Sequence, residues 1–90
     1  MKFEFDGSKS ITNKEKHGID FYEAQELWDD PFRIEIPGKN IRGEERYLMI
    51  AELNNCIWAA IYTYRENKLR IISVRKTREN ERKIYYNTRL

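Results

Sequence analysis

The chain has 90 residues, of which 40% are hydrophobic and 36% are charged, and its formal net charge is +2. This length and composition predict one folded domain over residues 1–90 with a single core, and they exclude a disordered chain. No apolar run approaches the ~20 residues of a membrane span, the polar N-terminus excludes a signal peptide, and a single cysteine excludes an internal disulfide, so we expect a cytoplasmic protein.

A short strand and a short helix are predicted first. Residues 2–5 alternate between polar and apolar side chains, which indicates a strand. The turn at 6–8 leaves Ser8 to cap a helix over residues 9–17. Gly18 then suits the left-handed position that follows a helix.

The second predicted helix has the clearest signals. Asp20 caps it, and Glu23, three residues later, completes a capping box. Pro31 ends it, because the residue before a proline disfavours helical geometry. The apolar residues at helical spacing, which we expect to be buried, are Phe21, Ala24, Leu27 and Trp28.

Four strands joined by short turns are predicted next. They span residues 32–36, 47–53, 56–65 and 69–75. The turns between them fall at 37–40, 54–55 and 66–68. Thr77 is expected to cap a last helix over 78–90. The resulting order, β-α-α-β-β-β-β-α, predicts an α+β fold in which helices pack on an antiparallel meander sheet of four or five strands.

Basic residues concentrate at the C-terminal end. Residues 65–90 hold 9 Lys and Arg against 3 Asp and Glu, whereas residues 1–64 hold 8 against 12. Strict strand alternation predicts Leu69, Ile71, Ser73 and Arg75 on one side and Arg70, Ile72 and Val74 on the other. On the last helix, one stripe holds Arg78, Arg82, Tyr85 and Arg89. This patch suits an anionic partner such as RNA, but solvated helix faces also carry such charges.

Few other residues suggest chemistry. His17 is the sole histidine, and it is either an acid or base or simply a cation at a helix C-terminus. Cys56 lies in an apolar run, so we expect a small buried side chain. The sequence contains neither a metal-ligand cluster nor a phosphate-binding loop, so we expect no metal and no cofactor.

Several segments together resemble the BrnT family, small ribonuclease toxins of type II toxin–antitoxin systems with a RelE-like fold. The matching segments are KFEFD (2–6), KHGIDFYEA (16–24), DDP (29–31), EERYLMI (44–50), YTYR (62–65), RIISVRK (70–76) and ER (81–82) with Tyr85. They follow the family's order over almost the whole chain. One departure is Tyr64, which stands where the family often has Glu.

The resemblance implies a metal-independent endoribonuclease that cleaves RNA and inhibits translation. It implies a BrnA-like ribbon-helix-helix antitoxin that forms a hetero-oligomer with the toxin, and DNA binding only through that complex. Under this hypothesis four arginines bind phosphate and stabilise charge: Arg65, Arg70, Arg75 and Arg82. The candidate acids and bases are Glu45, His17 and Tyr64. The alternative is a non-catalytic basic module that binds an acidic partner or RNA.

Overall fold

A computed structural model describes residues 1–88 of the chain and confirms the α+β class and the predicted order of elements. The elements are β1 (Phe3–Glu4), α1 (Gly7–His17), the 3₁₀ helix η1 (Glu23–Asp29), β2 (Ile34–Ile41), β3 (Glu44–Leu53), β4 (Cys56–Arg65), β5 (Lys68–Lys76) and α2 (Glu79–Thr88). Arg89, which was expected to extend the stripe on the last helix, lies outside the described residues. No helix within residues 1–88 is long and apolar enough to cross a membrane.

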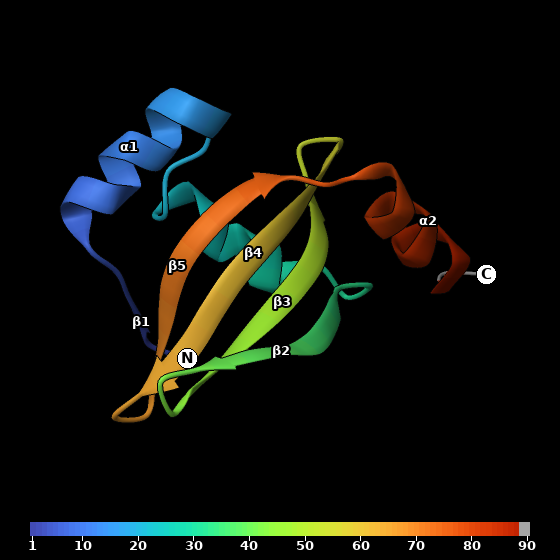
Figure 1. The fold of residues 1–90 in the computed structure, drawn as a ribbon. Coiled ribbons are helices and arrows are strands. Elements are labelled where there is room, and N and C mark those ends of the chain that lie inside the picture. The colour runs from blue at the N-terminus through green and yellow to red at the C-terminus, as the bar shows by residue number, and fades with distance from the viewer. Residues whose placement is uncertain (89–90) are drawn as a thin grey trace.

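The strands form one sheet in the order β1-β5-β4-β3-β2 (Figure 1). Strands β2 to β5 make the predicted antiparallel meander. The sheet as a whole is mixed, however, because β1 pairs in parallel with β5 through Phe3 opposite Leu69 and Glu4 opposite Arg70. The prediction of an antiparallel sheet is therefore wrong for β1. The parallel pair joins the first and the last strand of the chain, and no local turn pattern indicates such a pairing.

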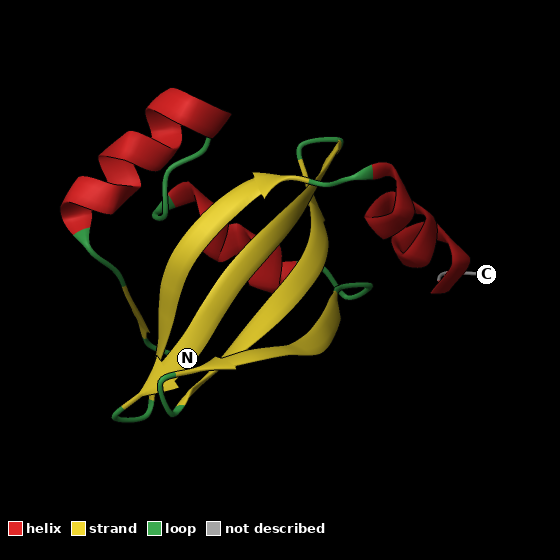
Figure 2. Cartoon of the chain, viewed as in Figure 1, coloured by secondary structure: helices red, strands yellow, loops and turns green. Residues whose placement is uncertain are grey.

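The main core lies between the sheet and η1, which passes behind the strands (Figure 2). The capping box before η1 is present: the Asp20 carboxylate accepts from the Glu23 N–H at 2.7 Å, and the Glu23 carboxylate accepts from the Asp20 N–H at 3.0 Å. The four predicted apolar residues of this segment are all buried. We call this side of the sheet the helix face.

A bulge in β5 overturns the predicted assignment of its side chains. Ile61 of β4 pairs with Ser73, and the next residue, Tyr62, pairs with Ile71, so that Ile72 is an extra residue. Such a residue reverses the alternation of the strand. Leu69, Ile71 and Val74 are therefore all buried in the core of the helix face. The opposite side receives Arg70, Ser73 and Arg75.

We call this opposite side the open face. Figure 2 shows no helix of the described chain in front of the strands there, and α2 lies beside them. Within the described residues of α2, Tyr85 joins a small core with Ile50 and Ile57 at one end of this face. Tyr85 is buried, so it does not share an exposed stripe with Arg82.

Two predicted helix caps are wrong. Asp6, not Ser8, caps α1, because its carboxylate accepts from the N–H groups of Ser8 and Lys9. The Thr77 hydroxyl donates to the Ile57 carbonyl instead of capping α2. Gly18 has the expected positive φ of 82° at the end of α1.

The turn predicted at 37–40 is also wrong. Strand β2 runs through these residues with an irregular register and turns at Arg42 and Gly43, whose φ angles are 52° and 80°. Pro37 is tolerated because β2 is an edge strand. Asn54 and Asn55 do form the predicted hairpin turn, with φ angles of 52° and 65°. Cys56, next to it, is exposed and not buried.

Candidate functional site

The open face brings together four arginines from three neighbouring strands. Arg70 and Arg75 of β5 lie opposite Thr63 and Ala59 of β4, and Arg65 continues this face at the end of β4. Arg46 of β3 joins them, because it lies two residues before Leu48, which pairs with Ile61. Three of these residues were predicted as phosphate ligands, whereas Arg46 was not.

Carboxylates hold three of the arginines in place, and two of these pairs lie near the ends of the strands. Arg65 binds Glu44 through Nε at 2.9 Å and Nη2 at 2.8 Å. Arg70 lies 3.5 Å from a carboxylate oxygen of Glu4. The hydrogen bond from Arg65 holds the pKa of Glu44 below its usual value. Glu44 is therefore ionised at neutral pH and orients Arg65.

Arg75, the third of them, has the most extensive contacts. Its Nη1 and Nη2 atoms donate to the two carboxylate oxygens of Glu81 at 2.8 and 3.0 Å. The N–H of Arg78 donates to the same carboxylate at 2.8 Å. In α2, Arg82 donates to the Thr77 carbonyl at 2.6 Å. Arg75 and Arg82 thus both lie at the junction of β5 and α2, and both are part of how this junction is built.

Arg46 is the arginine of this cluster least engaged by the protein. Its Nε atom is buried and has no hydrogen-bond partner within residues 1–88. The nearest acidic atom recorded is Oε1 of Glu44 at 3.6 Å, which is longer than a hydrogen bond. This contact is an ion pair, and about 33% of the Arg46 side chain stays exposed, so an anion from outside the chain can approach the residue beside Glu44. The sequence signal for it was the alternation of Glu44, Arg46 and Leu48, which places the three on one face.

An apolar groove lies beside Arg46 and Arg75 on the open face. It has a volume of about 290 Å³, and its walls include Lys39, Ile41, Leu48 and Ile61. Gly38 brings β2 close here: a Cβ atom at this position would lie 2.7 Å from the carbonyl oxygen of Arg46. The groove therefore combines apolar walls with two guanidinium groups.

Two of the three predicted acids and bases lie away from the arginines. Glu45 and Tyr64 alternate with the open-face residues of β3 and β4, so they belong to the helix face. There the Tyr47 hydroxyl donates to Glu45 at 3.1 Å, and the Tyr47 and Tyr64 rings lie 5.6 Å apart. Burial raises the pKa of Tyr64. Its phenol is therefore protonated at neutral pH, so it suits an acid better than a base.

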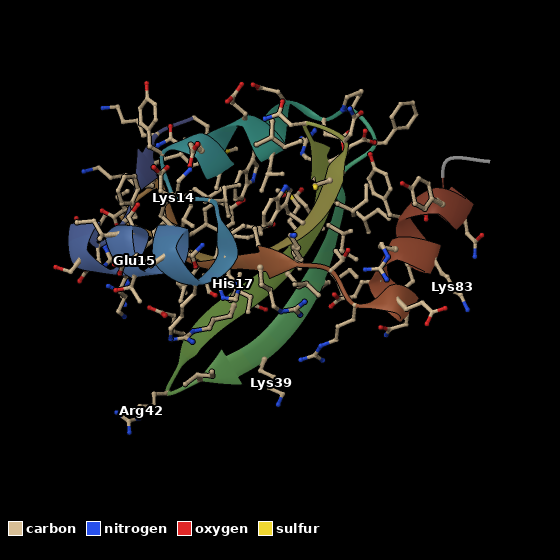
Figure 3. All side chains as sticks on the ribbon, turned by 90° about the horizontal axis from the view of Figure 1, so that it is seen from above. Lys14, Glu15, His17, Lys39, Arg42 and Lys83 are labelled. Carbon is tan, nitrogen blue, oxygen red and sulfur yellow. The ribbon has the colours of Figure 1, made fainter. Side chains whose placement is uncertain are left out.

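His17, the third candidate, lies at the last residue of α1, beside β5 (Figure 3). It lines a pocket between α1 and β5 together with Ser73, a residue of the open face. Of the three candidates, His17 is thus the one placed at the border of the open face.

No metal centre accompanies these groups in the described part of the chain. Residues 1–88 hold no set of three or more His, Cys, Asp or Glu side chains arranged to bind a metal ion. The groups that the open face offers are guanidiniums, ionised carboxylates and hydroxyls. They suit binding of a phosphodiester.

Comparison with known protein families finds one family whose model matches this chain. The model of the ribonuclease toxin BrnT of type II toxin–antitoxin systems matches residues 5–81. No curated protein matches the sequence.

Proposed function

Because this chain belongs to the BrnT family of ribonuclease toxins of type II toxin–antitoxin systems, we propose that it is a metal-independent endoribonuclease that inhibits translation. The observation that carries this proposal is the cluster of Arg46, Arg65, Arg70 and Arg75 on the open face. Arginine forks match phosphate geometry, and RNA supplies its own nucleophile in the ribose 2′-hydroxyl.

In the proposed reaction the 2′-oxygen attacks the adjacent phosphorus and the bond to the 5′-oxygen breaks. The products are a 2′,3′-cyclic phosphate and a 5′-hydroxyl end. Negative charge builds up on the phosphoryl oxygens, and guanidinium groups held in advance stabilise it. One such donor contributes about 10²–10³ in rate. We assign this role to Arg46 and Arg70, with Arg65 and Arg75 supporting the binding surface.

His17 is the acid or base that the geometry favours. A base must take the 2′-hydroxyl proton and an acid must protonate the leaving 5′-oxygen, and each contributes about 10²–10⁴ in rate. His17 borders the open face through Ser73, whereas Glu45 and Tyr64 project from the other side of the sheet. Arg82, whose side chain donates to the Thr77 carbonyl just before α2, then has a secondary role in phosphate binding.

The partner is an antitoxin, as the family implies. We propose a BrnA-like ribbon-helix-helix protein that forms a hetero-oligomer with the toxin and carries the DNA binding of the complex. The groove beside Arg46 and Arg75 fits a segment of the antitoxin that presents apolar side chains and carboxylates. Such a segment would cover the cations that RNA needs.

The test compares the wild type with His17→Gln, Glu45→Gln and Tyr64→Phe. Each chain is induced alone in a bacterium while RNA 5′ ends are mapped, and each purified chain is incubated with RNA in EDTA. We expect growth arrest and new 5′ ends with the wild type, cleavage that persists in EDTA, and loss of both in His17→Gln alone.

Other results have distinct meanings. Loss of cleavage in Glu45→Gln or Tyr64→Phe with normal activity of His17→Gln would move the acid–base group to the helix face. Protection of RNA without any cut would contradict the ribonuclease and favour a binding module. Activity that EDTA abolishes and Mg²⁺ restores would contradict the metal-independent reaction.

A further inference from the structure

A second cationic site lies outside the arginine cluster, in the pocket between α1 and β5. The pocket has a volume of about 270 Å³. Its polar lining consists largely of Ser8, Lys9, Thr12, Lys16, His17 and Ser73. It offers hydroxyl donors and cations, and no carboxylate of the described residues lines it.

The helix repeat explains why these cations share the pocket. Lys9, Thr12 and Lys16 follow one another at intervals of three and four residues, which places them on one face of α1. The ion pairs found within residues 1–88 do not include Lys9 or Lys16. Lys14, on another face of the same helix, binds Glu23 at 2.8 Å and does not line the pocket (Figure 3). The two lysines of the pocket therefore have their charge available to a ligand.

The pocket is fixed in shape because Asn13 docks α1 on the edge of β5. Its side-chain amide donates to the carbonyl of Val74 at 2.9 Å and accepts from the Val74 N–H at 3.2 Å. A third hydrogen bond, of 2.8 Å, joins Asn13 to the Ile19 carbonyl. The amide thus occupies the position of a neighbouring strand, and it holds the lysines of α1 beside Ser73.

The pocket is continuous with the open face. Ser73 belongs to both, and Arg70 lies 3.5 Å from Glu4, which shortly precedes the Asp6 cap of α1. The Asp6 carboxylate, which caps α1, lies at this start of the helix. This carboxylate already accepts from two backbone N–H groups. A chain of phosphates on the open face can therefore continue past Arg70 into the pocket.

We propose that the pocket between α1 and β5 is a phosphate subsite, in which Lys9, Lys16 and the hydroxyls of Thr12 and Ser73 hold a backbone phosphate of the RNA strand. This inference rests on the proposed function, since it extends the binding track for the same substrate. The subsite binds the phosphodiester and not a base, so it adds affinity for RNA of any sequence.

Binding of a short single-stranded 2′-O-methyl RNA tests the subsite without cleavage, because this RNA lacks the nucleophilic hydroxyl. The Kd is measured over a range of salt concentrations for the wild type and for Lys9→Gln/Lys16→Gln. The control is Lys14→Gln/Lys83→Gln, which removes the same charge from two lysines that bind Glu23 and Glu79. All four side chains are exposed, so each variant should fold.

We expect the pocket variant to bind about threefold to tenfold more weakly at low salt. Its plot of log K against log salt should be shallower by about 1.4, or 0.7 for each of two lost phosphate contacts. The control should behave as the wild type does. Unchanged affinity and slope in the pocket variant, or an equal loss in the control, would overturn the subsite.

A parallel assay with cleavable RNA separates the two proposals. If the wild type cuts RNA but the pocket variant binds the methylated strand normally, the subsite is refuted and the ribonuclease stands. If the wild type binds the methylated strand through the lysines but does not cut natural RNA, the ribonuclease is refuted and the subsite stands. Absence of any binding by the wild type would refute the subsite directly.

Discussion

Arg75 of β5 and Glu81 of α2 form a bidentate ion pair, with N–O distances of 2.8 and 3.0 Å. The pair joins the end of the sheet to the first turns of α2, so it helps to determine where the helix begins. The Glu81 side chain is only 9% exposed, which keeps water away from the hydrogen bonds. Arg75 is therefore not free to act as a phosphate ligand. The substitution Arg75→Ala alone would disturb both the fold and the site.

Glu81→Gln should lower the free energy of unfolding by about 2 kcal/mol at pH 7, because it removes the charge that strengthens the hydrogen bonds to the Arg75 guanidinium. Urea unfolding measures this change. The hydrogen bond from Arg75 holds the pKa of Glu81 below its ordinary 4.5. The stabilisation is thus complete above about pH 4.5 and is lost as the pH falls through the pKa of the folded state.

The pH dependence supplies the control for this pair. The glutamine side chain of the variant does not titrate, so the difference between wild type and variant should shrink below about pH 4. A difference that stays constant down to about pH 3 would show that the loss comes from packing and not from the charge.

Tyr85→Phe should destabilise the protein by about 2 kcal/mol, because it deletes a hydrogen bond to a charged acceptor. The Tyr85 hydroxyl donates to Asp30 at 2.5 Å, and the same carboxylate oxygen accepts from the Glu52 N–H at 2.8 Å. Thermal and urea unfolding report the change. The matched control is Tyr86→Phe, whose ring is 49% exposed, and an equal effect there would contradict the assignment.

Asn13→Ala should cost about 3 kcal/mol, since it leaves buried backbone groups of Val74 and Ile19 without partners. The amide proton of Val74 should exchange with solvent faster in the variant, because the edge of β5 is then uncovered. Amide exchange followed by NMR measures it. Asn87→Ala, at an exposed position of α2, should change neither quantity, and normal protection of Val74 in Asn13→Ala would refute the docking role.

Arg46→Ala should reduce RNA cleavage by about 10²–10³, the effect of removing one preorganised donor. Stability should change little, because the polar contact that is lost is a partly exposed ion pair with Glu44 at 3.6 Å, and such pairs contribute about 0–1 kcal/mol. The control is Arg33→Ala, an exposed arginine whose charge acts on Tyr64 at the helix face. Initial rates of cleavage compare the two. Full activity of Arg46→Ala would exclude this residue from the site.

Features that depend on a few adjacent residues could be predicted from the sequence. The capping box of Asp20 and Glu23, the turn at Asn54 and Asn55, and the left-handed Gly18 all formed as predicted, because each satisfies its own backbone groups locally. The meander followed from the order of strands and short turns. The basic C-terminal residues and the family resemblance could likewise be recognised in the sequence, and the family is confirmed.

Which of these residues come into contact depends on how distant segments of the chain pair and pack. Because of the bulge at Ile72, Arg75 lies on the open face and not on the same side as Ile71, as strict alternation predicts. A one-residue slip sends every following side chain to the other face. The same alternation separates Glu45 and Tyr64 from the arginines and brings Arg46 among them. The parallel pairing of β1 with β5 and the docking of Asn13 on Val74 join residues far apart in the sequence, 61 positions in the case of Asn13. No local pattern encodes such contacts, because their free energy comes from burial and pairing between distant segments.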